Sequence, residues 1–316
     1  MPKALTEQGV NMESFFYPSS TGLCDVAAYK WLPEGKPKAV IQIVHGMAEH
    51  AVRYDDIARF LTEQGYAVYA EDHPGHGASI NGRGKKGYFA ESDGWSRVID
   101  DIMFLHNTAR ADHPDAPMVL YGHSMGSFLA RTCASRYPDE FDAFIFSGTA
   151  GKNPVLAIAK AIANAHIKKT GGDKPDEQLN GLAFGAYAKK IKDPRTMFDW
   201  LTHDEAIVDK YAADDLCGFT FTSAAFRDLF DGLGEISGKQ WAEKVKNVPI
   251  YLLAGKEDPV GNYGKGVVEV CENLMKTGHT KVVLQLYENG RHEMHNETNR
   301  DEVYRGIAAF LRSAVE

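Results

Sequence analysis

The chain has 316 residues, of which 44% are hydrophobic and 25% charged, a composition that is ordinary for a folded globular protein. Its net charge of -8, with no block of Lys and Arg, argues against nucleic acid as a partner. No apolar stretch approaches the roughly 20 residues that a membrane-spanning helix needs. Residues 1–11 lack the apolar run of a signal peptide, and the four cysteines show no CxxC or metal-ligand spacing. We therefore expect a cytoplasmic protein with reduced, buried cysteines and no transmembrane segment.

Short β-branched runs alternate with helical patterns along most of the chain. An antiparallel edge strand is expected at residues 26–31, and buried strands are expected at 39–44, 67–70, 118–121, 143–146, 250–254 and 282–286. Apolar residues on one helical face lie between or after these runs, around 57–61, 99–106 and 303–311. This alternation predicts an α/β fold with a mostly parallel central sheet flanked by helices.

The alternation stops between about residues 151 and 246. This segment predicts helical pieces joined by turns and a clear loop at 171–175, and the strand pattern resumes at Val248. The helical pieces are expected at 155–167, 182–191, 204–211 and 224–229. The segment is rich in aromatic residues, namely Phe184, Phe198, Trp200, Phe219, Phe221, Phe226 and Phe230. We therefore expect a core domain of residues 1–150 and 247–316 and a helical cap, or lid, of residues 151–246.

Residues 45–50 (HGMAEH) follow the first buried strand of the series. A His-Gly pair at this place resembles the loop that supplies one backbone N–H of an oxyanion hole, while the residue after the nucleophile supplies the other. These residues are Met47 and Met125. Two such donors stabilise the negative oxygen of a tetrahedral intermediate. His45 and His50 are expected to hold the loop by hydrogen bonds rather than to act as bases.

Residues 72–77 (DHPGHG) follow the next strand and contain two histidines and an aspartate. Such a set could hold a metal ion, but no further ligand with suitable spacing lies nearby. We therefore expect these side chains to order the loop, and we expect no metal and no cofactor.

Residues 122–126 (GHSMG) lie between the strand at 118–121 and a helical pattern that includes Phe128 and Leu129. A G-x-S-x-G sequence between a strand and a helix is typical of a nucleophile elbow, in which a sharp turn strains the backbone of the serine. Glycines flank the serine because the neighbouring strand and helix leave room only for small residues. We predict that Ser124 is the nucleophile, displayed beyond the carboxyl end of the sheet.

A serine nucleophile needs a base, and the base needs an acid that orients it. After a nucleophile elbow the acid precedes the histidine in the chain. Asp258 follows the strand at 250–254, and we predict that it is the acid; Glu257 beside it is the rival.

His292 follows the strand at 282–286, at the end of the sheet where Ser124 is expected. We predict that His292 is the base. His295 is its rival, and it is expected in the first turn of the next helix.

Taken together, these motifs resemble the α/β-hydrolase fold and, more narrowly, the monoacylglycerol lipase and lysophospholipase group, which is also called serine aminopeptidase-like. The stretches FDWLT (198–202) and CGF (217–219) look like cap motifs of bacterial members. The resemblance covers the chain from about Ser14 to Leu311. It implies a carboxylic ester hydrolase that works through an acyl-enzyme, with a cap over an apolar acyl channel.

The resemblance implies a small ester with an apolar acyl or aryl group as substrate. An acyltransferase, an amide or peptide hydrolase, and a non-catalytic ligand-binding homologue remain alternatives. Epoxide hydrolase and dehalogenase chemistry is disfavoured, because those enzymes have an aspartate where this chain has Ser124. Contact of the cap with a membrane surface and the oligomeric state are left open.

Overall fold

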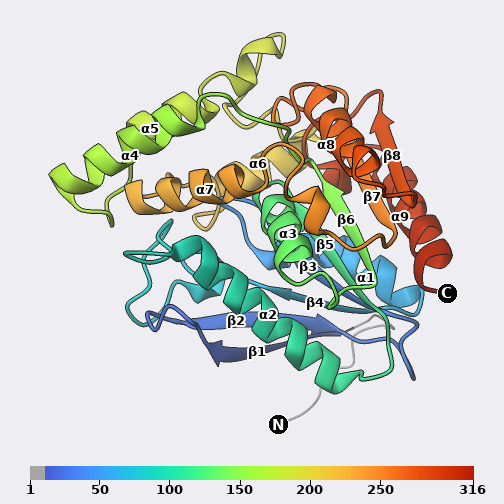
Figure 1. The fold of residues 1–316 in the computed structure, drawn as a ribbon. Helices are drawn as coiled ribbons and strands as arrows, with labels where there is room; N and C mark the ends of the chain where they lie inside the picture. The colour runs from blue at the N-terminus through green and yellow to red at the C-terminus, as the bar shows by residue number, and fades with distance from the viewer. Residues whose placement is uncertain (1–10) are drawn as a thin grey trace.

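The computed structural model describes residues 11–316, and within this range the strands form one eight-stranded sheet (Figure 1). Their spatial order is β1-β2-β4-β3-β5-β6-β7-β8. The pairs β1–β2 and β2–β4 are antiparallel, and every other pair is parallel. The strands are β1 (Met12–Pro18), β2 (Asp25–Trp31), β3 (Val40–Val44), β4 (Ala67–Glu71), β5 (Met118–His123), β6 (Ala143–Ser147), β7 (Ile250–Gly255) and β8 (Val282–Tyr287). The predicted parallel strands are thus all present.

The two edges of the sheet differ from the sequence prediction. The strand expected at 26–31 is β2, which is antiparallel but does not lie at the edge, because β1 pairs along its outer side. In β1 only Tyr17 is buried and Phe15 is half-buried beside it, so the apolar face of this strand is too short to give a clear alternating pattern. At the other edge, β8 alternates between half-buried and exposed residues, and Val283 is 50% exposed. The expected burial of both faces therefore fails at β8.

Helices cover both faces of the sheet. One face carries α1 (Asp55–Glu63) and α9 (Arg300–Val315), and the other carries α2 (Gly94–Asp112), α3 (Met125–Arg136) and α8 (Lys265–Lys276). Short 3-10 helices lie in the connections at η1 (Ala51–Tyr54), η2 (Gly77–Ser79) and η5 (Met294–Asn296). The predicted helices around 57–61, 99–106 and 303–311 are α1, α2 and α9. The sheet is therefore closed on both faces, as a parallel sheet requires.

The connection from β6 to β7 is helical and lies above one end of the sheet in Figure 1. It consists of α4 (Leu156–Thr170), α5 (Glu177–Phe184), η3 (Tyr187–Lys190), α6 (Glu205–Ala213), α7 (Ser223–Glu235) and η4 (Ala242–Lys244). The continuous helix predicted at 182–191 is wrong. The chain instead leaves the helix at Gly185 and forms a separate 3-10 turn.

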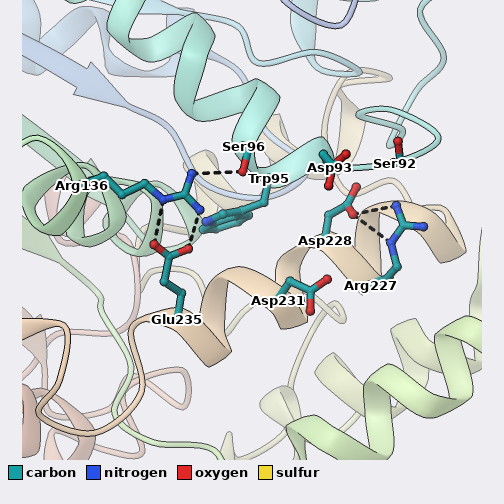
Figure 2. A pocket seen from close by; sticks show the side chains of 9 residues that line it. All are labelled: Ser92, Asp93, Trp95, Ser96, Arg136, Arg227, Asp228, Asp231 and Glu235. Atoms are coloured by element: carbon teal, nitrogen blue, oxygen red, sulfur yellow. Dashed lines mark hydrogen bonds and ion pairs between the residues drawn. The ribbon is translucent and has the colours of Figure 1, made fainter.

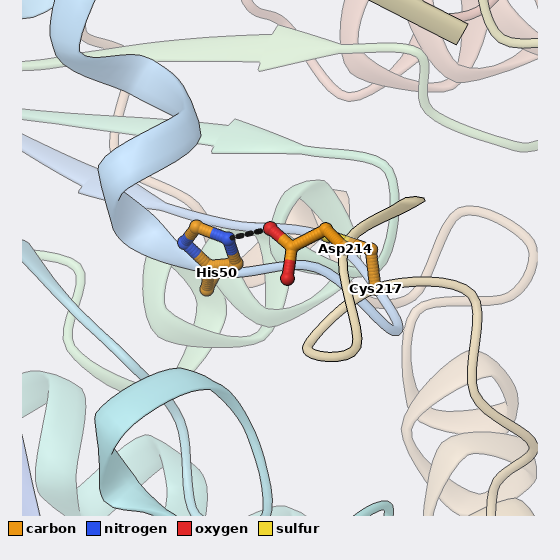
Figure 3. A group of neighbouring side chains, drawn as sticks. All are labelled: His50, Asp214 and Cys217. Atoms are coloured by element: carbon orange, nitrogen blue, oxygen red, sulfur yellow. Dashed lines mark hydrogen bonds and ion pairs between the residues drawn. The ribbon is translucent and has the colours of Figure 1, made fainter. Parts of the chain in front are cut away.

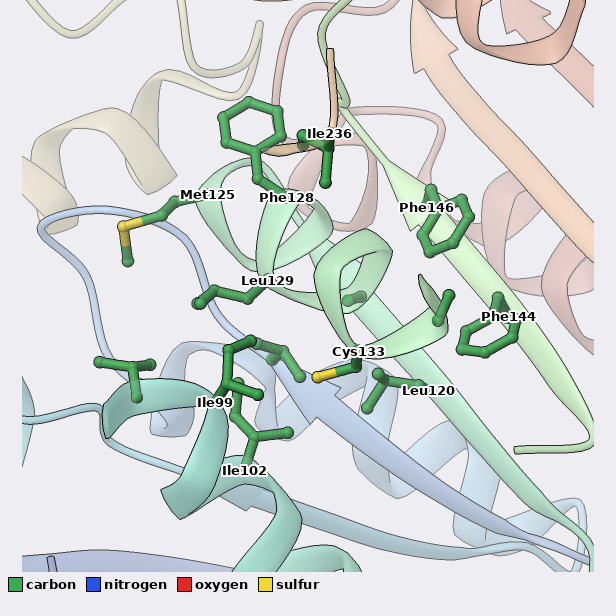
Figure 4. Packing of buried hydrophobic residues seen from close by; sticks show 14 of the residues in the cluster. Ile99, Ile102, Leu120, Met125, Phe128, Leu129, Cys133, Phe144, Phe146 and Ile236 are labelled. Carbon is green, nitrogen blue, oxygen red and sulfur yellow. The ribbon is translucent and has the colours of Figure 1, made fainter. Parts of the chain in front are cut away.

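A buried cluster fixes the junction of β5 and α3 (Figure 4). Leu129 and Cys133 of α3 pack with Ile99 and Ile102 of α2, and Leu120 of β5 lies beneath them. All five side chains are fully buried. The N-terminus of α3 is therefore held firmly at the end of β5, where the predicted nucleophile lies.

The described residues also bear on the expected location of the chain. No helix in the range 11–316 combines the length and apolar character needed to cross a bilayer. All four cysteines are buried and unpaired, as predicted. Residues 1–10, which hold most of the segment searched for a signal peptide, lie outside the described residues.

Candidate active site

Ser124 lies in the turn between β5 and α3, where the backbone is strained. Its φ of 53° and ψ of -121° fall outside the regions that residues with a side chain normally adopt. Its N–H donates to the carbonyl of Ser147 at 2.9 Å, and its carbonyl accepts from the N–H of Ser127 at 2.8 Å. The neighbouring strand and the first turn of α3 therefore hold Ser124 in the geometry of a nucleophile elbow.

The glycines around Ser124 leave no room for a side chain. A Cβ on Gly122 would lie 2.2 Å from the carbonyl oxygen of Gly126, and a Cβ on Gly126 would lie 1.9 Å from that of Val44. A Cβ on Gly46 would lie 3.1 Å from the Cβ of Ser124. Only glycine therefore fits on either side of the serine. The loop of residues 45–50 also lies close to Ser124.

Asp258 and His292 lie together at the same end of the sheet. The Oδ2 of Asp258 is 3.0 Å from Nδ1 of His292, and Asp258 is fully buried. Its other oxygen, Oδ1, accepts from the N–H of Val260 at 2.8 Å. The His292 ring lies 4.6 Å from the ring of His123, the residue before Ser124. The structure thus brings the predicted acid, base and nucleophile to one place.

The charges around His292 favour its protonated form. Burial lowers the pKa of His292, but the carboxylate of Asp258, with smaller contributions from Glu293 and Glu49, outweighs burial. The pKa of His292 therefore lies above its ordinary value.

The rival residues have other partners. The Oε2 of Glu257 lies 3.3 Å from Nε2 of His203, and its side chain is 49% exposed. His295 is fully buried against Tyr54, with ring centres 4.4 Å apart, and burial lowers the pKa of His295 to about 3. It lies in η5 rather than in the first turn of α9, where the sequence placed it. Glu257 thus faces a different histidine, and burial against Tyr54 favours the neutral form of His295.

The predicted oxyanion loop is held in a fixed shape by its own residues. The N–H of Gly46 donates to Oε1 of Glu49 at 2.6 Å, and Ala48 adopts a positive φ of 54°. Within residues 11–316, the backbone N–H groups of Met47 and Met125 donate to no other protein atom. Both amides are thus unpaired donors close to the elbow.

The histidines and the aspartate that follow β3 and β4 order their loops, as predicted. The Asp72 carboxylate accepts from the N–H groups of Ala51 and Ala78, each at 2.8 Å. The Nε2 of His45 accepts from the N–H of His73 at 3.0 Å. These hydrogen bonds join the two loops to each other and to the backbone around them.

Arg53, which no sequence motif singled out, links the oxyanion loop to the histidine loop. Its Nη1 donates to Glu49 at 2.5 Å, and its two terminal nitrogens donate to Glu293 at 2.7 and 2.6 Å. Burial raises the pKa of Glu293, but Arg53 outweighs burial and holds that pKa at about 2. At Glu49, which receives only one of these bonds, burial prevails and the pKa is raised. Glu293 directly follows His292, so Arg53 ties together the two sides of the site.

The helical segment between β6 and β7 is fastened to the same two loops. The carbonyl of Leu201 accepts from the N–H of Glu293 at 2.7 Å, and Trp200 lies against the His292 ring with centres 5.1 Å apart. The carbonyl of Ala48 accepts from the hydroxyl of Tyr211 and from the N–H of Gly218, each at 2.9 Å. The stretches FDWLT and CGF, noted in the sequence, therefore each hold one loop of the site.

A polar pocket of about 290 Å³ lies away from these residues, between the ends of α2, α3 and α7 (Figure 2). It is lined by the ion pairs Arg136–Glu235 and Arg227–Asp228 and contains none of the predicted site residues. Burial raises the pKa of Asp228 to about 6. The Arg136–Glu235 pair connects α3 to α7, whereas Arg227 and Asp228 are neighbours on α7. The pocket therefore lies at a junction of helices and has a structural explanation.

Replacement of Arg53 by Met should destabilise the fold by about 3–5 kcal/mol, because two buried carboxylates lose their cation. Urea unfolding of Arg53→Met would measure this loss. Lys276→Met is a matched control, because Lys276 forms an exposed pair with Glu272 that should contribute less than about 1 kcal/mol. Equal losses in the two variants would contradict the importance of the buried pair.

Comparisons with known proteins agree with this geometry. The family model described as serine aminopeptidase, S33, matches residues 35–299. A solved carboxyl esterase from Bacillus coagulans is 33% identical with a TM-score of 0.91, covering 96% of this chain and 99% of that one. The monoacylglycerol lipase of Mycolicibacterium smegmatis is 29% identical over 289 residues, which is 90% of this chain and 91% of that protein. The monoglyceride lipase of Rattus norvegicus is 27% identical over 267 residues, or 84% and 79% of the two chains. The protein belongs to the serine aminopeptidase S33 family of α/β hydrolases.

Proposed function

We propose that this serine ester hydrolase uses Ser124 as nucleophile, His292 as general base and Asp258 as the residue that orients His292. The observation that carries the proposal is the pairing of the buried Asp258 carboxylate with Nδ1 of His292, 3.0 Å apart, beside a serine in a strained elbow. Because Nδ1 faces Asp258, the Nε2 atom remains for the serine proton. This is the tautomer that a general base needs.

The reaction then proceeds in two halves. His292 takes the hydroxyl proton of Ser124 while the oxygen attacks the ester carbonyl, and the resulting oxyanion accepts hydrogen bonds from the N–H groups of Met47 and Met125. The intermediate collapses to an acyl-enzyme as His292 gives its proton to the leaving alcohol. Water then repeats the sequence on the acyl-enzyme, and the acid is released. The unpaired state of both amides supports their assignment as the oxyanion hole.

Residues 151–246 act as a cap over an apolar substrate channel in this proposal. Aromatic rings lead from the base into the cap: Trp200 contacts His292, Tyr187 contacts Trp200, and Phe184 contacts Tyr187. Among the other predicted cap aromatics, Phe221, Phe226 and Phe230 are buried core residues. The remaining rings suit an acyl chain or an aryl group.

The proposed substrates are monoacylglycerols and similar small esters. The names of the Mycolicibacterium and rat relatives, monoacylglycerol lipase and monoglyceride lipase, support this class. Exposed apolar residues of the cap, Val155, Ile158, Leu182 and Met197, support transient contact with a membrane or lipid surface. Four unpaired cysteines support a reducing, cytoplasmic location.

Ser124→Ala should abolish hydrolysis of p-nitrophenyl esters and of monoacylglycerols and should prevent labelling by a fluorophosphonate probe, because both depend on the serine oxygen. Ser127→Ala is the matched control, since its hydroxyl donates to the Ser124 carbonyl and performs no chemistry. The unmodified protein would also be assayed on esters of different acyl length, on a peptide, and on an ester with an added acceptor alcohol. These assays compare ester hydrolysis with peptide hydrolysis and with acyl transfer. Turnover of the peptide without ester hydrolysis would contradict the proposal.

Asp258→Asn should lower kcat by on the order of 10⁴, because the amide would stabilise the wrong tautomer of His292. Glu257→Gln, which changes the adjacent carboxylate that faces His203, should leave kcat nearly unchanged. Steady-state kinetics on one ester would measure both. A large loss in Glu257→Gln with little loss in Asp258→Asn would instead assign Glu257 as the acid.

The pH profile of kcat/KM should have an acidic limb above pH 6.5, the ordinary pKa of a histidine. The pKa of His292 is raised and only its neutral form accepts the serine proton, so activity falls as the pH falls through that raised pKa. Removal of the Asp258 charge should move the limb in Asp258→Asn to lower pH. A limb below pH 6.5 in the unmodified protein would contradict the assignment of His292 as the base.

A further inference from the structure

A second group of chemically active side chains lies where the helical segment meets the oxyanion loop (Figure 3). His50 ends the oxyanion loop, while Asp214 and Cys217 lie in the turn after α6. Nε2 of His50 lies 2.9 Å from Oδ2 of Asp214, and one ligand atom from each of the three residues lies within 4.8 Å of the others. His50 and Asp214 are 164 positions apart in the chain, so no spacing motif reveals the group.

These three side chains supply the donor set of a zinc site. Zn²⁺ binds thiolate, imidazole and carboxylate together, with bonds of about 2.0–2.3 Å. Ligands around a tetrahedral ion at such bond lengths are about 3.4 Å apart. The His50 and Asp214 atoms therefore need to separate by only about half an ångström, and the ion would replace their direct contact. A fourth position would remain for water.

The surroundings of the group favour a dication. Cys217 is faced by Arg53 with one positive charge and by Asp214, Glu49 and Glu293 with one negative charge each. When the thiol is deprotonated, the three ligands carry two negative charges. The nearby Arg53, Glu49 and Glu293 together add one further negative charge. The Asp214 side chain is 33% exposed whereas the His50 side chain is 13% exposed, so an ion can enter from the Asp214 side.

We propose that His50, Asp214 and Cys217 form a binding site for a divalent transition-metal ion, with Zn²⁺ as the best match. On binding, the Cys217 thiol gives its proton to solvent, and the sulfur, the carboxylate and the imidazole each donate an electron pair to the metal. The ion cross-links the turn after α6 to the oxyanion loop, where Tyr211 and Gly218 already hold the Ala48 carbonyl. This site is separate from the proposed triad.

Cobalt(II) provides the test. A thiolate ligand gives Co²⁺ a charge-transfer absorption in the near ultraviolet, whereas imidazole and carboxylate ligands do not give this band. The full chain, reduced, free of metal and without a polyhistidine tag, would be titrated with CoCl₂. The proposal predicts the thiolate band with saturation at one equivalent, loss of the band on addition of Zn²⁺, and a higher melting temperature with either ion.

Variants identify the ligands. Cys217→Ser should abolish the thiolate band, and His50→Gln should weaken Zn²⁺ binding at least about tenfold, since loss of an outer-shell partner alone typically weakens binding by about 10- to 100-fold. Cys271→Ser is the matched control, because Cys271 is a buried free cysteine on α8, and it should retain the band. Asp214→Asn serves as a second ligand variant if Cys217→Ser does not fold.

His292→Gln separates this site from the active site. It should lose ester hydrolysis under the proposed function but keep the thiolate band and its stoichiometry. A thiolate band that persists in Cys217→Ser would place the ion at one of the other cysteines and overturn the proposal. The absence of any thiolate band at saturating Co²⁺ would show that the group is only a hydrogen-bonded latch, and this too would overturn it.

Discussion

The buried guanidinium of Arg53 is the interaction on which the geometry of this site depends. A charge this far from solvent is costly unless it is paired, and Arg53 is paired on both sides, with Glu49 of the oxyanion loop and Glu293 of the histidine loop. Glu49 also accepts the N–H of Gly46, where a Cβ would lie only 3.1 Å from the Cβ of Ser124. A shift of either loop would leave a carboxylate buried without its partner. The nucleophile, the predicted oxyanion donors and the base are therefore held in one frame.

The helical segment between β6 and β7 is bound directly to the loops of the site. Leu201 receives the N–H of Glu293, while Tyr211 donates to Ala48 and lies over Arg53 with its ring centre 4.7 Å from the guanidinium carbon. Movement of the stretches around residues 198–202 and 211–218 would thus disturb the loops that hold the chemistry. The exposed apolar residues on α4 and α5 lie outside these contacts, so the outer helices can move with less effect on the site.

The sequence predicts those parts of the fold that have a strong local cause. The buried parallel strands and the elbow at Ser124 follow from apolar runs and from glycines that steric contact requires. The strand β1 and the break at Gly185 escape prediction, because the apolar face of β1 is short and helices of this chain also contain glycine, so glycine alone does not mark a break. Arg53 and the group of His50 with Asp214 escape it for another reason. Their partners come together only through the fold, and no local pattern records such a contact.

The arrangement of charge around His292 connects stability with the proposed chemistry. During attack the imidazole becomes a cation, and the carboxylates of Asp258, Glu293 and Glu49 all raise the pKa of this ring, against the lowering effect of burial. Each of these carboxylates therefore stabilises the cationic form of the ring that arises during attack. Arg53 pairs with Glu49 and Glu293, whereas Asp258 lies within 3.0 Å of Nδ1 of the ring. The same guanidinium that holds the loops therefore also offsets negative charge beside the base.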